Sequence, residues 1–169
     1  MGSYYWFNVN NNSIFVYNNY VRLVIQRVKY ASCKVDDKIT GSIKTGYMVL
    51  VGFSLNDNKD ITSKMAEKMS KLRIFEDEEG KMNKSIYDVD GKVLSISQFT
   101  LYADSKKGNR PSFTNAMPGN ESIELYKYFN ECLRALNLEV EEGIFGADMK
   151  IELLNDGPVT IILDSEELW

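Results

Sequence analysis

The chain has 169 residues, which is enough for one compact domain with a hydrophobic core and too few for two comfortable ones. Its apolar and charged fractions, 44% and 26%, are typical of a soluble globular protein, and no run approaches the roughly 18 apolar residues of a membrane-spanning helix, so no membrane partner is expected. Cys33 and Cys132 show neither CxxC spacing nor a disulfide-rich pattern, so we expect reduced thiols and a cytoplasmic protein. The formal net charge of −4 argues against wrapping of nucleic acid by overall charge, and the absence of histidine excludes Ser–His–Asp and Cys–His catalysis and histidine-ligated zinc.

Residues 1–20 differ from the rest of the chain. They contain no charged side chain, are rich in asparagine and hold four aromatic residues in one run from Tyr4 to Phe7. The basic start, apolar core and cleavage site of a signal peptide are missing, so secretion is not expected. Because the periodic pattern begins abruptly at Val21, we interpret residues 1–20 as an atypical extension, either a flexible tail or a start-site misassignment, with an added strand as the alternative. Residues 21–169 then form a single domain.

The first half of this domain alternates extended runs with turns. Apolar residues at spacings of three and four from Ile61 to Leu72 predict an amphipathic helix over 60–72. The acidic run 76–79 before Gly80 predicts a solvated turn rather than a metal site. The predicted strands are 22–28, 32–35, 38–43, 47–53 and a short one at 74–75.

The second half contains the longest predicted strand, from Lys92 to Tyr102, followed by a polar loop over 105–117 that is a natural binding surface. A second amphipathic helix is predicted over 121–136, with Cys132 in its apolar stripe. Further strands are expected at Val140, 143–145, 149–154 and 159–163. Two helices among mostly hairpin-connected strands predict an α+β domain built on an antiparallel sheet or barrel.

Two segments carry more polar chemistry than their predicted elements require. Ser97, Gln98 and Thr100 are either polar residues accommodated in a sheet or the lining of a site, and a nucleophilic hydroxyl there needs an adjacent base that the local sequence does not provide. The cations of the next loop, Lys106, Lys107 and Arg110, are either solvated or contact a few RNA phosphates.

The segment Asn155-Asp156-Gly157-Pro158 predicts a turn between the last two strands. The alternative is a functional turn, because an X–Pro bond adopts the cis form at a cost of only ~0.5–1 kcal/mol and can then present carbonyl oxygens in an unusual direction. Both interpretations remain open at the level of local sequence.

Three separated motifs together resemble the D-aminoacyl-tRNA deacylase family. They are SQFTLYAD at 97–104, KGNRPSF at 107–113 and NDGPVT at 155–160. The likeness covers roughly residues 21–164 and includes Arg22 to Val28, Arg73 to Asp77, and Phe145-Gly146-Ala147. Family members begin near Val21, so residues 1–20 depart from the pattern.

The resemblance implies a symmetric homodimer of β-rich subunits that takes D-aminoacyl-tRNA as substrate and needs no metal or cofactor. The implied catalytic segment is Ser97, Gln98, Phe99 and Thr100, with the N–H groups of Phe99 and Thr100 facing the scissile carbonyl. Gly157 and Pro158, joined by a cis bond, project into the pocket from the partner subunit and reject L substrates, whereas glycyl-tRNA is cleaved. Arg27 holds that motif, and Met149 and Ala147 form part of the substrate-binding wall.

Two other functions fit the residues. One is a noncatalytic nucleic-acid-binding module on the same scaffold, although DNA is not an expected partner. The other is a small-ester hydrolase that depends on Thr100. The deacylase is preferred because three separated motifs occur in the right order. The resemblance also implies that the terminal 2′-hydroxyl of the substrate assists attack by water, whereas a Thr100 nucleophile has no evident activating base.

Overall fold

A computed structural model describes residues 21–169, so the expectations for residues 1–20 lie outside the described part of the chain. The elements confirm an α+β fold with two main amphipathic helices, and a short C-terminal helix was not predicted. In chain order they are β1 Val21–Val35, β2 Lys38–Ile43, β3 Gly46–Phe53, α1 Lys59–Ser70, β4 Phe75–Glu76, β5 Met82–Lys84, β6 Lys92–Ser97, the 3-10 helix η1 Phe99–Tyr102, α2 Gly119–Ala135, β7 Val140–Glu142, β8 Lys150–Asp164 and α3 Ser165–Leu168.

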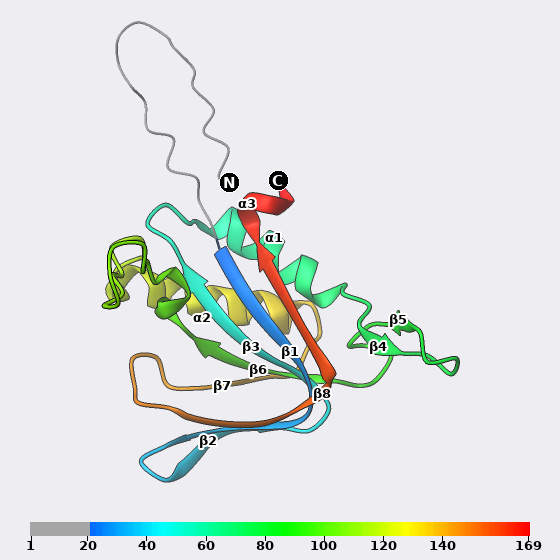
Figure 1. The fold of residues 1–169 in the computed structure, drawn as a ribbon. Coiled ribbons are helices and arrows are strands. Elements are labelled where there is room, and N and C mark those ends of the chain that lie inside the picture. The colour runs from blue at the N-terminus through cyan, green and yellow to red at the C-terminus, as the bar shows by residue number, and fades with distance from the viewer. Residues whose placement is uncertain (1–20) are drawn as a thin grey trace, which may run out of the picture.

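The main sheet curls around β1 into a nearly closed, barrel-like shape (Figure 1). Its order is β2-β1-β3-β6-β7, and β8 pairs with β1 along almost the whole of that strand. All pairs made by β1 are antiparallel, whereas β3–β6 and β6–β7 are parallel because the intervening chain crosses over through helices. The sheet is therefore mixed, with its antiparallel part centred on β1.

Two hydrophobic cores lie on opposite faces of this sheet. The larger one joins the sheet to α1 and α2, which lie behind it in Figure 1, and includes the fully buried Met65, Met69 and Phe129. The smaller one fills the curled half of the sheet and includes Val28, Cys33 and Leu94. Alternation along β1 sends Arg27 to the first face and Gln26 and Val28 to the second.

The predicted strand from Lys92 to Tyr102 is wrong beyond Ser97. Gln98 N–H still donates to Val51 O at 2.8 Å, but the chain then turns into η1, where Leu101 N–H donates to Gln98 O. The turn packs closely over Gly52, where an added Cβ would lie 3.0 Å from Gln98 O and 3.1 Å from the Tyr102 ring. The longest strands are instead β1 and β8, with 15 residues each.

Two further predictions near the C-terminus are wrong. No strand forms at 143–145. Gly143 N–H still donates to Ser95 O at 3.1 Å, but β7 ends at Glu142 and the chain then turns at Phe145 and Gly146, where φ of Gly146 is +76°. Asn155 to Pro158 is not a turn between two strands, because β8 continues through it. Gln26 pairs with Thr160 and Val28 with Asn155, so residues 156–159 of β8 lie opposite Arg27 alone. We call residues 156–159 the Gly-Pro bulge.

Candidate functional site

A cavity of about 690 Å³ lies where β3 and β6 end. Its walls come from these strand ends, from η1, from the start of α2 and from the segment 145–149 that precedes β8. This volume is within the usual range for a small-ligand site. Val51 of β3 pairs with Ser97 of β6 and both line the cavity, so the two paired strand ends form part of its wall.

Most of the predicted catalytic segment lines this cavity. Ser97, Gln98 and Phe99 are in its wall, whereas Thr100 is exposed and outside it. The Thr100 hydroxyl accepts a hydrogen bond from Gln98 Nε2, an amide nitrogen that cannot serve as a base. The backbone N–H groups of Phe99 and Thr100 begin η1, where no carbonyl within the helix precedes them as an acceptor.

The cavity lining includes Ala147 and Met149, two of the predicted substrate-binding residues. It also contains two aromatic residues that the prediction of individual site residues missed, Phe113 and Phe145. The Phe113 ring packs edge-on against Phe99, with centroids 5.1 Å apart. Both aromatic residues belong to motifs on which the family resemblance rests, and their place in those motifs could have identified them as site residues.

The other predicted substrate-binding residues lie away from this cavity. Gly157 and Pro158 are exposed in the Gly-Pro bulge, and neither they nor the buried Arg27 belong to its lining. The Gly157–Pro158 peptide bond is cis, which the family resemblance implies. Within one chain, the structure therefore separates the predicted site residues into two groups.

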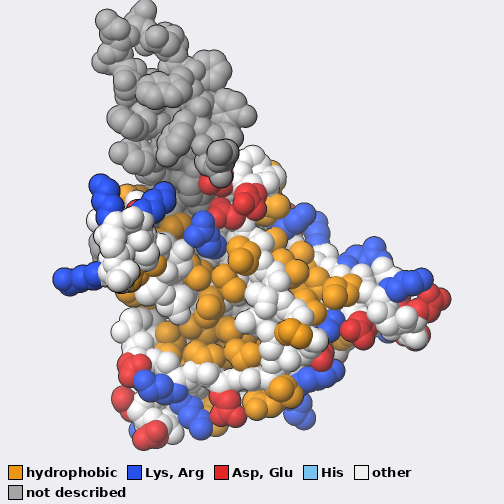
Figure 2. Space-filling model, in the orientation of Figure 1, with side chains coloured by type: hydrophobic (Ala, Val, Ile, Leu, Met, Phe, Trp, Pro, Cys, Tyr) orange, Lys and Arg blue, Asp and Glu red, His pale blue; other side chains and the backbone are white. Residues whose placement is uncertain are grey.

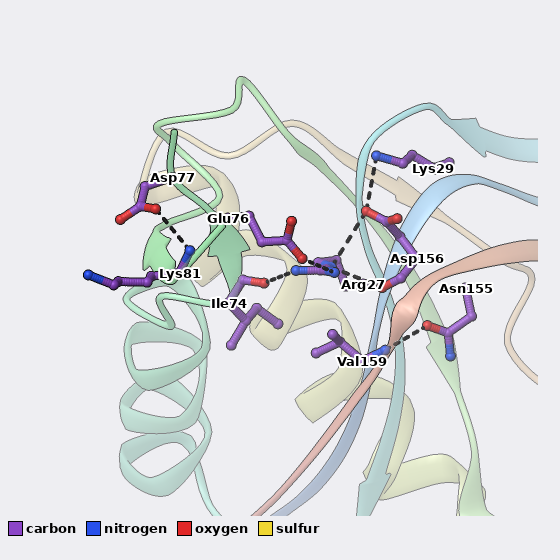
Figure 3. A network of polar contacts seen from close by, with 9 residues as sticks. All are labelled: Arg27, Lys29, Ile74, Glu76, Asp77, Lys81, Asn155, Asp156 and Val159. Carbon is purple, nitrogen blue, oxygen red and sulfur yellow. Dashed lines mark hydrogen bonds and ion pairs between the residues drawn. The ribbon is translucent and has the colours of Figure 1, made fainter. Parts of the chain in front are cut away.

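Arg27 connects the Gly-Pro bulge to the loop after α1 (Figure 3). Its Nε donates to Asp156 O at 2.9 Å, its Nη1 donates to Ile74 O at 2.6 Å, and its Nη2 lies 3.4 Å from Glu76 Oε1. The side chain is only 3% exposed. A Cβ at Gly157, where φ is +126°, would lie 2.9 Å from Arg27 Nη2, so glycine allows the guanidinium to approach the bulge.

The predicted RNA-binding residues Lys106, Lys107 and Arg110 are all exposed in the loop after η1. An antiparallel bridge between Asp104 and Ser112 closes the base of this loop. Phe113 follows directly and contacts Phe99 in the cavity wall. The basic loop therefore starts and ends beside the rim of the cavity.

A buried carboxylate lies close to the far end of η1. Asp57 is 8% exposed and accepts a hydrogen bond from Ser54 N–H at 2.6 Å. Burial raises the pKa of Asp57 to about 7, the hydrogen bond from Ser54 opposes this shift, and the negative charge of Asp164 adds to it. Arg22 links the same region to η1, since it donates to both Asp164 Oδ2 and Leu101 O.

Residues 21–169 contain no group of three or more Cys, Asp or Glu side chains placed to hold a metal ion. In the same residues, no helix has the length and apolar character needed to cross a membrane.

Comparison with known proteins identifies a family. The profile of D-Tyr-tRNA(Tyr) deacylase matches residues 24–164. The D-aminoacyl-tRNA deacylases of Deinococcus radiodurans and Deinococcus deserti are each 55% identical over 144 residues, covering 85% of this chain and 99% of theirs. That of Bacillus pumilus is 53% identical over 147 residues, covering 87% of this chain and 100% of its own.

Two solved structures are also similar. One, described as c-Myc DNA Unwinding Element Binding Protein, has 42% identity and a TM-score of 0.79, and the match covers 84% of this chain and 97% of the other. A probable eukaryotic D-amino acid tRNA deacylase has 17% identity and a TM-score of 0.75, with 86% and 99% of the two chains covered, and shows a likeness of fold alone.

Proposed function

Because the chain belongs to the D-Tyr-tRNA(Tyr) deacylase family, we propose that it hydrolyses the ester that joins a D-amino acid to tRNA. Water adds to the ester carbonyl carbon, the bond to the ribose oxygen breaks, and a free D-amino acid and tRNA are released. The observation that carries the proposal is the cavity at the end of β6, whose lining brings Ser97, Gln98 and Phe99 together with Ala147 and Met149.

Backbone groups suffice for this chemistry. The N–H groups of Phe99 and Thr100 are the proposed donors to the developing oxyanion, and the loss of one such donor costs ~3 kcal/mol of transition-state stabilisation. Since the chain has no histidine, we assign the assistance of water attack to the 2′-hydroxyl of the terminal adenosine of the substrate. The protein then needs only to position the ester.

Chirality is selected by rejection in this proposal. The carbonyl oxygens of Gly157 and Pro158 crowd the side of the α-carbon where an L side chain projects, whereas a D side chain points away from them. Glycine has no side chain to reject, so glycyl-tRNA is also a substrate. The support for this role is the firm attachment of the Gly-Pro bulge to Arg27.

The rejecting residues act in the cavity of a second copy, because Gly157 and Pro158 are exposed and lie outside the cavity of their own chain. The sheet face opposite the helices supports a homodimer. Cross-strand partners form a row from Ile162, which is 63% exposed, through Val24 and Leu50 to Ile96 in the cavity lining. Figure 2 shows the apolar side chains gathered on this face. Sedimentation that finds a catalytically competent monomer contradicts the dimer.

The basic loop supplies local contacts to the tRNA. Lys106, Lys107 and Arg110 are exposed beside the cavity rim, and their side chains meet a few phosphates close to the esterified end. Three cations release at most about three counterions, so the dependence of binding on salt is expected to be shallow, with a log–log slope no steeper than roughly −3.

The paired enantiomer assay tests the function. With D-tyrosyl-tRNA and L-tyrosyl-tRNA at equal concentration, we expect release of D-tyrosine and negligible release of L-tyrosine. If the protein is instead a noncatalytic nucleic-acid-binding module, it should bind both substrates without turnover. One of the two similar structures is described as a DNA-binding protein. Equal turnover of the two enantiomers contradicts the rejection mechanism but not ester hydrolysis.

A Thr100→Ala variant separates the deacylase from a Thr100-dependent hydrolase of small esters. We expect it to retain kcat within about tenfold of the wild type, because the hydroxyl is exposed outside the cavity and no base contacts it, and the backbone N–H is unchanged. Initial rates with D-tyrosyl-tRNA and with substrate lacking the terminal 2′-hydroxyl provide the measurement. Complete loss in the variant, with full activity on the modified substrate, favours the nucleophilic mechanism instead.

A further inference from the structure

The Gly-Pro bulge is fixed from both faces of the sheet, and only one of these attachments involves Arg27. From the helix side, the guanidinium reaches Asp156 O at the beginning of the bulge. From the opposite face, Asn155 Oδ1 accepts a hydrogen bond from Val159 N–H at 3.1 Å. Asn155 directly precedes the bulge and Val159 is its last residue, so this bond spans the bulge. The bulge is thus attached at its beginning by Arg27 and at its end by Asn155.

Gln26 links this second attachment to β1. Its Oε1 accepts a hydrogen bond from Asn155 Nδ2 at 2.6 Å and another from the Thr160 hydroxyl. Asn155 and Thr160 are the residues on either side of the bulge, so a single side chain of β1 holds both of its ends together. Gln26 pairs with Thr160 across the strands, and its side chain lies on the face away from α1 and α2.

We propose that Asn155 and Gln26 are positioning residues for chiral selection, and this rests on the function proposed above. Four residues of β8 opposite one of β1 lack regular ladder pairing, so side chains must fix the direction of the Gly157 and Pro158 carbonyls. Steric rejection requires those oxygens to stay in place, because a displacement near 1 Å relieves the clash with an L side chain. The Asn155–Gln26 bridge prevents the end of the bulge from pivoting about the Arg27 contact.

Measurement of kcat/KM for D-tyrosyl-tRNA and L-tyrosyl-tRNA with full-length variants tests the proposal. In Asn155→Ala and Gln26→Ala, we expect the L-to-D ratio to rise about tenfold or more while D turnover changes by less than about threefold. Asn155→Asp keeps the acceptor for Val159 N–H but loses the Nδ2 donor to Gln26 Oε1, so we expect it to recover only part of the selectivity. The matched control is Ser32→Ala, because Ser32 is half-buried and lies on β1 like Gln26. It should leave the D and L rates unchanged.

The outcomes distinguish the bridge from the function on which it rests. Equal hydrolysis of both enantiomers by the wild type overturns the rejection mechanism and the bridge together. A selective wild type with unchanged selectivity in Asn155→Ala and Gln26→Ala overturns the bridge alone. Parallel loss of D and L turnover in these variants, or dissociation of the assembly in sedimentation, assigns Asn155 and Gln26 to folding or association and also overturns it.

Discussion

Replacement of Arg27 by methionine is expected to destabilise the protein by about 2–4 kcal/mol and to remove most of the discrimination against L-aminoacyl-tRNA. The side chain is 3% exposed and donates to Ile74 O and Asp156 O, so its loss leaves two backbone carbonyls without these donors at ~1–3 kcal/mol each. The same contacts attach the Gly-Pro bulge to the loop after α1, and the bulge then loses its attachment on the helix side. Urea denaturation gives the stability, and paired D and L rates give the selectivity.

Two further variants control for charge at this position. Arg27→Lys keeps the positive charge but cannot span Ile74 O and Asp156 O with one planar group, so we expect only partial recovery. Lys29→Met removes an exposed cation that lies 3.1 Å from Asp156 Oδ2, and we expect a change of less than about 1 kcal/mol and unaltered selectivity. Equal effects of Arg27→Met and Lys29→Met would falsify the specific role of Arg27.

The second large effect is a loss of stability as the pH rises, caused by Asp57. Burial raises the pKa of this carboxyl from its ordinary value to about 7, so between pH 4 and 7 the folded protein retains a proton that the unfolded chain has lost. The unfolded state then binds fewer protons, and the free energy of unfolding falls as pH increases, by up to about 1.4 kcal/mol per pH unit. The stability from this proton is complete below pH 4 and is lost as the pH passes through about 7.

Comparison with Asp57→Asn isolates this effect. The amide oxygen of asparagine can still accept from Ser54 N–H but does not titrate. Exposed carboxylates act in the opposite sense, as in Asp77, whose pKa is lowered by hydrogen bonds from Asn83 and Lys81. We expect the stability of wild type minus that of Asp57→Asn, measured by urea denaturation from pH 4 to 8, to fall by about 2–4 kcal/mol. A constant difference over this range contradicts the titration of Asp57.

Local pattern was sufficient for the parts of the fold that local contacts determine. The helical stripe around Met65 and Met69 and the apolar run of β3 were predicted correctly, because each element buries side chains with its own periodicity. The local hydrophobic pattern failed to predict the extent of a strand where pairing with a distant segment determines it. Residues 22–28 and 32–35 were predicted to be extended, and residues 29–31 received no assignment. Pairing with β8 makes Val21–Val35 one strand that includes the exposed Lys29 and Tyr30.

The motifs of the candidate site could be predicted from the sequence, but the relative positions of their residues in space could not. The alternating pattern from Ser97 to Thr100 favoured a strand, but the chain bends into η1, which packs against Gly52. Residues 97–102 alone give no indication of that contact, because Gly52 is distant in the sequence. The partners of Arg27 include the carbonyl oxygens of Ile74 and Asp156, which are present at every position of any chain and leave no signature in the sequence.

The pairing of β1 with β8 also sets the order in which the protein can mature during translation. Residues 22 and 164 are neighbours in the sheet, yet they leave the ribosome roughly 7–30 s apart at ordinary elongation rates. Until then β1 has β2 and β3 beside it but no strand along its other edge, which stays available to other chains. The Gly-Pro bulge lies on β8, the last strand of the main sheet in chain order, so a nascent chain can form the bulge only after the other strands of that sheet have been made.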